Sequence, residues 1–147
     1  MEWKEQYSVG IEEIDDQHKK LLKLFSAIEE SAKSKRSTWQ DVLYGIVALR
    51  GVARSHFEFE EGLMRLYGFS GLAAHEASHR QFFVRLDEIA KKPHHETATN
   101  ELIEFLLDWL VNHILGADKE YAKHVLSGAP VVRSSPPRPL ANTLKFA

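Results

Sequence analysis

Residues 75–89 read HEASHRQFFVRLDEI, and this stretch decides the fold. Its apolar residues recur at intervals of three, four and seven, which is the period of an α-helix and not of a strand. His75 and His79 lie beside that apolar face, because residues four apart share one side of a helix. The stretch therefore predicts a helix that carries two imidazoles into or near a protein core.

Three other stretches have the same period. We expect a first helix from about residue 14 to residue 35, a second from about 38 to 66, and a fourth from about 97 to 127. The apolar stripe of the second helix includes Val42, Leu43, Ile46, Leu49, Val52 and Ala53. Because no strand pattern competes and the connections are short, we predict an all-α, up-down-up-down four-helix bundle.

The segments outside the helices predict two attachments to this bundle. Residues 1–12 read as an extended N-terminal arm, which the rings of Trp3 and Tyr7 pin onto the helices. Residues 128–147 contain four prolines and no acidic residue, which is typical of a loosely ordered tail. We therefore divide the chain into a four-helix domain, 1–127, and a Pro-rich tail, 128–147.

Composition excludes several classes of function. The chain has 147 residues, a formal charge of −2 and no cysteine. Disulfides, iron–sulfur clusters and thiolate zinc sites are thereby excluded, and the charge argues against a nucleic-acid surface. No apolar run approaches a membrane span and no signal core begins the chain, so we expect a soluble cytoplasmic protein.

Histidine is the unusual residue, with eight in the chain. The helices carry His18, His56-x-x-x-Glu60, His75-x-x-x-His79 and His113-x-x-x-x-Asp118, each on or beside an apolar face. A lone histidine is usually exposed or satisfied in the core, but here all four helices contribute. Unpaired buried polar groups cost roughly 1–3 kcal/mol each, so five imidazoles and two carboxylates need a common partner. A metal site is that partner, and without cysteine it must use imidazole and carboxylate.

The pair on the fourth helix has an unfavourable spacing. Five residues of ideal α-helix rotate Asp118 about 140° away from His113, so the two side chains would not share a face. A π-type turn inserts one residue and would bring them together. We therefore predict a widened turn between these residues, and Gly116 lies where it would ease the distortion.

The complete pattern resembles the hemerythrin family, particularly its bacterial single-domain members. The flanking residues agree, since Ser8-Val9-Gly10-Ile11 and Ile14-Asp15-Asp16-Gln17 precede His18 as in that family. Trp109-Leu110 ahead of His113 is similar too. The resemblance covers roughly residues 3–125, and all seven ligand positions are filled.

The resemblance implies a centre of two non-haem iron ions. His75, His79 and His113 would bind one iron, and His18 and His56 the other. Glu60 and Asp118 would bridge them together with an oxo or hydroxo group, which leaves one open coordination position for dioxygen. The resemblance also implies an apolar oxygen pocket that excludes water and slows oxidation of the site, formed by Phe57, Trp109, Leu110 and Ile114.

A few residues depart from the family pattern or lie outside it. Gly68 follows Tyr67 where the family often has proline, and Ser78 stands where it often has glutamate. The second change removes a carboxylate that could polarise a ligand, and so alters iron affinity or redox behaviour. The remaining histidines, His94, His95 and His124, read as surface residues and not as ligands.

The expected function is reversible dioxygen binding for storage, transport or sensing, without enzymatic activity. Its expected partners are dioxygen and a protein that receives it, with no nucleic acid and no membrane. The alternatives are a diiron oxidase, a peroxidase or a nitric-oxide-consuming enzyme, and a metal-buffering module. Oxygen-activating bundles carry Glu-x-x-His on two helices and are rich in carboxylates. The ratio of five imidazoles to two carboxylates instead favours binding dioxygen over splitting it, although such ligands also accept manganese, zinc or cobalt.

Overall fold

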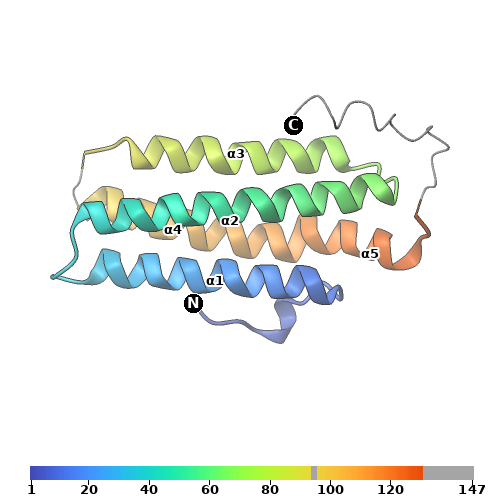
Figure 1. Cartoon of the computed structure of the whole chain (residues 1–147), viewed down its shortest axis with the longest axis horizontal. Coiled ribbons are helices and arrows are strands. Elements are labelled where there is room, and N and C mark those ends of the chain that lie inside the picture. The colour runs from blue at the N-terminus through green and yellow to red at the C-terminus, as the bar shows by residue number, and fades with distance from the viewer. Residues whose placement is uncertain (94–95, 131–147) are drawn as a thin grey trace, which may run out of the picture.

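A computed structural model describes residues 1–93 and 96–130, and it is an all-α bundle (Figure 1). The elements are η1 (Glu5–Tyr7), α1 (Glu12–Lys33), α2 (Trp39–Leu66), α3 (Leu72–Ala90), α4 (Glu96–His113), η2 (Ile114–Asp118) and α5 (Lys119–Ser127). Four long helices lie side by side, and the fourth consists of the consecutive elements α4, η2 and α5. The predicted four-helix bundle is confirmed, and most of the predicted tail, residues 131–147, lies outside the described residues.

Local chemistry fixes the two ends of α2. Thr38 and Asp41 form a capping box, in which the Thr38 amide donates to Asp41 Oδ2 at 2.7 Å and the Asp41 amide donates to Thr38 Oγ1 at 3.3 Å. Such a cap contributes about 1 kcal/mol. At the other end Gly68 has a φ of +62°, a conformation that glycine adopts without strain. The helix therefore ends where the sequence predicts.

The N-terminal arm is docked, but it is not fully extended. Residues 5–7 form one turn of 3-10 helix, which places the buried ring of Tyr7 on the bundle and Trp3 edge-on to it at 5.9 Å. Beyond the turn, Ser8 Oγ donates to Asp15 Oδ2 at 2.5 Å, and the Val9 amide donates to Asp15 Oδ1 at 2.9 Å. The arm thus covers the start of α1.

The core is one continuous apolar cluster that runs between the helices. Val52 was predicted to belong to it, and this was wrong, because its side chain is 37% exposed. Three residues of helix rotate it about 60° from the buried Leu49, to the edge of the stripe. Elsewhere α1 and α2 approach closely, since a Cβ on Gly45 would lie 2.8 Å from Cγ1 of Ile28. No helix in residues 1–93 and 96–130 is long and apolar enough to cross a membrane.

Candidate metal centre

The widened turn predicted between His113 and Asp118 is present. Residues Ile114–Asp118 form a π-helix, and Asp118 Oδ1 lies 3.0 Å from His113 Nε2. Both side chains are buried. Gly116 is not required for this geometry, since its φ is not positive and an added Cβ would meet nothing within 4 Å. The extra residue in the turn, and not the glycine, brings the two ligand candidates onto one face.

All seven predicted ligand residues come together inside the bundle. Their donor atoms form two overlapping groups, and within each group the atoms lie within 4.8 Å of one another. One group comprises Glu60, His75, His79, His113 and Asp118, and the other comprises His18, His56, Glu60 and Asp118. The two carboxylates belong to both groups.

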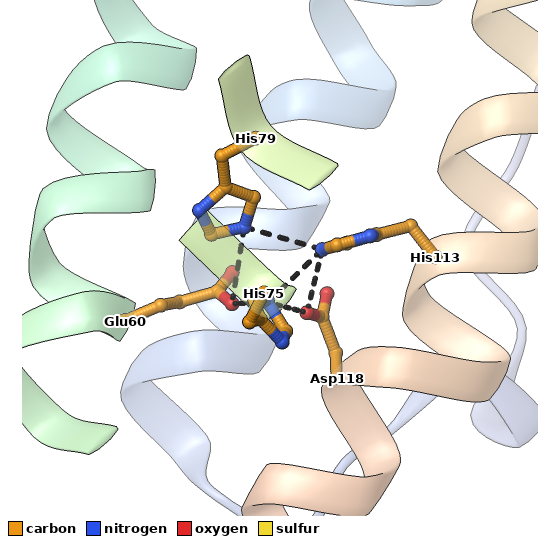
Figure 2. A group of neighbouring side chains, drawn as sticks. All are labelled: Glu60, His75, His79, His113 and Asp118. Atoms are coloured by element: carbon orange, nitrogen blue, oxygen red, sulfur yellow. Dashed lines mark hydrogen bonds and ion pairs between the residues drawn. The ribbon is translucent and has the colours of Figure 1, made fainter. Parts of the chain in front are cut away.

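Figure 2 shows the first group, with imidazoles from α3 and α4 converging between the two carboxylates. The Nε2 atom of His113 lies 3.2 Å from that of His79 and 3.1 Å from that of His75. The Nε2 atom of His75 is 3.1 Å from Asp118 Oδ1 and 3.3 Å from Glu60 Oε2. Three imidazole nitrogens and two carboxylate oxygens thus face a common point.

The second group is smaller and uses the other oxygens of the same carboxylates. His18 Nε2 lies 3.1 Å from Asp118 Oδ2 and 3.5 Å from Glu60 Oε1. His56 Nε2 is also paired with Glu60 Oε1, one helical turn further along α2. Each carboxylate therefore presents one oxygen to each group, which is the arrangement that two bridged metal ions require.

The buried polar atoms of the centre fit a metal better than they fit one another. Both ring nitrogens of His18 and both carboxylate oxygens of Glu60 and Asp118 are buried without a hydrogen-bond partner in the described chain. Leaving such atoms unsatisfied costs about 1–3 kcal/mol each, and more for charged groups. Divalent transition-metal ions bind such mixtures of imidazole and carboxylate, so the residues form a buried metal-binding cluster.

The electrostatics of the centre favour a cation. Burial opposes ionisation of Glu60 and Asp118, but the surrounding imidazoles hold the pKa of each carboxyl below its usual range. Burial likewise opposes protonation of His18, yet the nearby carboxylates of Asp118 and Glu60 raise its pKa to about 9. The pKa of His75 rises to about 9 for the same reasons. In the metal-free protein, protons on imidazole thus balance the carboxylates that a metal would otherwise neutralise.

Three side chains that the sequence analysis did not single out as partners touch the outer nitrogens of the cluster. Gln17 Oε1 lies 2.6 Å from His56 Nδ1, and Ser78 Oγ lies 3.2 Å from His113 Nδ1. Glu61 Oε1 lies 3.4 Å from His79 Nδ1. Each partner is the sequence neighbour of one ligand candidate, which places it near the centre, but it contacts a histidine on another helix, and only the packing of the helices decides which one. The serine at position 78 predicts the loss of a carboxylate beside the ligands. Glu61 nevertheless places a carboxylate against the outer nitrogen of His79.

Aromatic rings cover the three-histidine group. Phe57 stacks on His79, with ring centroids 3.8 Å apart and planes 6° apart. Trp109 stacks on His113 at 4.3 Å and 12°. Of the predicted oxygen-pocket residues, Phe57, Leu110 and Ile114 are buried and Trp109 is half-buried. Their burial suits an apolar wall, and their contact with dioxygen stays a prediction.

Two further residues of α5, Tyr121 and His124, are shielded from solvent, the first fully and the second in part. Tyr121, expected only to face inward, is fully buried with its ring edge-on to His75 at 5.2 Å and its hydroxyl without a hydrogen-bond partner in the described residues. His124 is half-buried, contrary to the prediction of a surface residue, because its Nε2 pairs with the Tyr67 carbonyl oxygen at 2.8 Å. It belongs to neither group of ligand candidates. The predictions for His94 and His95 fall outside the described residues.

Comparison with known proteins gives a consistent result. A family model described as the hemerythrin HHE cation binding domain matches residues 9–125. A bacteriohemerythrin of Stenotrophomonas maltophilia is 33% identical over 125 residues, covering 84% of this chain and 80% of the relative. A hemerythrin-like protein of Naegleria gruberi is 33% identical over 119 residues, covering 81% and 88%. A wild-type hemerythrin crystal structure superposes with a TM-score of 0.74 at 25% identity, over 85% of this chain and 97% of that one.

Proposed function

The chain belongs to the hemerythrin family, and from that premise we propose that it binds dioxygen reversibly at a pair of non-haem iron ions. One observation carries the proposal. Glu60 and Asp118 each turn one oxygen toward the three-histidine group and the other toward His18. A single metal ion would leave half of these donors unused, whereas two ions use them all.

We assign the ligands by the two groups. His75, His79 and His113 would hold one iron, and His18 and His56 would hold the other. Glu60 and Asp118 would bridge both ions, and a solvent-derived oxo or hydroxo group would complete the bridge. The group of His18 and His56 offers one imidazole fewer than the other group, so a metal held there would have room for a small molecule, as catalytic metal sites do.

The donor set favours binding over oxidation chemistry. Two ferrous ions held by these residues would supply the reversible electron transfer that dioxygen binding requires. Five neutral imidazoles and only two anionic carboxylates surround them, so the ligands stabilise highly charged iron weakly. Enzymes that split dioxygen in a helix bundle use a Glu-x-x-His motif on each of two helices. Together, the two groups of this chain instead contain more imidazoles than carboxylates.

The apolar side chains of the interior would protect the bound gas. Phe57, Leu110 and Ile114 are at most 4% exposed, and they belong to the same core cluster. A wall of this kind would keep water and protons out of the interior of the centre, which would slow irreversible oxidation of a metal held there. Reversibility is thus assigned to the chain's own packing as well as to its ligands.

Oxygen uptake by the iron-loaded chain tests the proposal. Anaerobically reduced protein should take up one dioxygen for each pair of irons, measured with an oxygen electrode, and release it under vacuum. Uptake that continues beyond this ratio in the presence of a reductant would instead indicate catalysis.

A specific observation supports the enzymatic alternative. The hydroxyl of Tyr121 is buried beside the centre without a hydrogen-bond partner among the described residues, and a phenol in this position can donate its O–H to a peroxide held at the centre. Tyr121→Phe separates the two functions, because it keeps the ring and removes only the hydroxyl. Loss of peroxide turnover together with unchanged oxygen uptake would identify a peroxidase activity that depends on Tyr121.

A further inference from the structure

Two of the three imidazoles in the three-histidine group are held from more than one side. His79 is stacked by Phe57 and contacts Glu61 at its outer nitrogen. His113 is stacked by Trp109 and contacts Ser78. Side chains fixed in this way lose little further freedom when a metal binds, so the group is preorganised.

The two-histidine group has much weaker support. The outer nitrogen of His18 has no hydrogen-bond partner in the described chain. His56 has one polar partner, Gln17, whose Oε1 lies 2.6 Å from His56 Nδ1. The ring of Phe57 lies 5.7 Å from that of His56 and is tilted by 50°, so Phe57 does not stack on this imidazole. The His18 ring meets that of His56 edge-on at 4.7 Å, so the hydrogen bond between the outer nitrogen of this imidazole and the Gln17 amide fixes its remaining rotation.

A surface groove reaches His56 where Gln17 lies. The groove measures about 620 Å³ and runs between α1 and α2, lined by Gln17, Lys20, Val47, Ala48, Gly51, Val52, Ser55, His56 and Phe59. Another groove, of about 650 Å³, reaches His113. There, however, the Trp109 ring lies flat against the imidazole and Ser78 contacts its outer nitrogen. At the groove that reaches His56, by contrast, the outer nitrogen of the imidazole contacts a half-buried amide.

We propose that the two metal positions are held unequally, and that Gln17 is the positioning residue that sets affinity and exchange at the position of His18 and His56. The inference rests on the proposed dimetal centre. If His56 Nδ1–H donates to Gln17 Oε1, then Nε2 carries the free lone pair, and it already faces Glu60. Without that amide the imidazole can turn toward the groove, which gives the metal a route to solvent. The three-histidine position fills first and empties last.

The test measures iron release from the fully loaded, full-length protein under anaerobic conditions. With a coloured ferrous chelator in excess, release should occur in two phases of equal size. Gln17→Ala should accelerate the faster phase by about 10–100-fold and leave the slower phase unchanged, as expected for loss of a partner that orients a metal ligand. Gln17→Glu, which offers a charged acceptor in the same place, should slow the faster phase.

Ser55→Ala is the matched control, because Ser55 lines the same groove and belongs to neither ligand group. Iron release from this variant should have the same two rates as release from the unsubstituted protein. If Gln17→Ala does not fold, which circular dichroism will show, the Gln17→Glu result decides alone. Release in one phase, or an equal effect of the Gln17 substitutions on both phases, would overturn the inference.

Anomalous diffraction from half-depleted crystals identifies the position that empties first. The remaining iron should lie beside His75, His79 and His113, and iron beside His18 and His56 would contradict the order. A chain that never takes up two irons would contradict the proposed function itself. A chain that takes up two and releases them together contradicts only this inference.

Discussion

The carboxylate of Asp118 lies 3.0 Å from the imidazole of His113, although the two residues are five positions apart in the chain. A regular helix would point these side chains about 140° apart. The π-turn Ile114–Asp118 removes that mismatch and returns the chain to regular helix at α5. One inserted residue thus completes both halves of the proposed dimetal centre, because Asp118 belongs to both.

The first prediction concerns that turn. Gly116→Ala should keep the π-turn and full metal content, because the added Cβ meets nothing within 4 Å and the backbone φ is not positive. Alanine in a helical position should also raise the free energy of unfolding, by up to about 1 kcal/mol. Metal analysis and urea unfolding check these outcomes. Loss of metal from this variant would show that the turn needs glycine after all.

The second prediction concerns the shared carboxylates. Asp118→Asn keeps the shape of the side chain but removes the charge, so metal content should fall from two ions per chain to one or none. Glu60→Gln should do the same, since both carboxylates face both groups. Elemental analysis of purified protein gives the ratio. Glu58→Gln is the control, because Glu58 is exposed on the same helix and should retain both ions.

These features show how far the sequence could predict the centre. The ligand candidates were found because imidazoles at helical spacing beside apolar residues are rare and costly without a metal. The π-turn followed from a spacing that an α-helix cannot accommodate. The outer contacts of Gln17 and Glu61 could not be predicted, because they join different helices and depend on the rotation of each about its axis. The prediction that Val52 is buried was wrong for a related reason. The periodicity of apolar residues shows that a helix has a buried face, but it does not show where that face ends.

The third prediction concerns the packing of α1 on α2. Gly45→Ala should lower the free energy of unfolding by about 1–3 kcal/mol, because its Cβ would lie 2.8 Å from the side chain of Ile28. Gly51→Ala on the same helix meets nothing within 4 Å and should be neutral or slightly stabilising. Chemical denaturation of both variants gives the comparison. Equal stability of the two would contradict the close approach of the helices.

The fourth prediction concerns the metal-free protein and pH. The pKa of His18 and of His75 is about 9 in the folded chain, above the ordinary value of 6.5. Their contribution to stability is therefore complete below pH 6.5 and is lost as the pH rises through 9. Burial lowers the pKa of His79 to about 3, so this group favours unfolding as the pH falls below 6.5.

The melting temperature of chelator-treated protein should consequently be highest near pH 6.5 and lower at pH 9.5, which is above the folded pKa values of about 9. Metal-loaded protein should not show this alkaline loss, because the metal requires neutral imidazoles and replaces their protons. Differential scanning calorimetry of both forms makes the comparison. An equal alkaline loss in the two forms would mean that the cluster histidines do not hold the metal.

The optical spectrum of iron-loaded protein tests the central claim most directly. It is recorded on the anaerobically reduced protein, again after air is admitted, and again after oxygen is removed. The account predicts a visible charge-transfer band that appears with air, disappears on deoxygenation and is absent from Asp118→Asn. A band that forms once and persists after oxygen is removed, or no band in protein that holds two irons, would contradict reversible dioxygen binding at this centre.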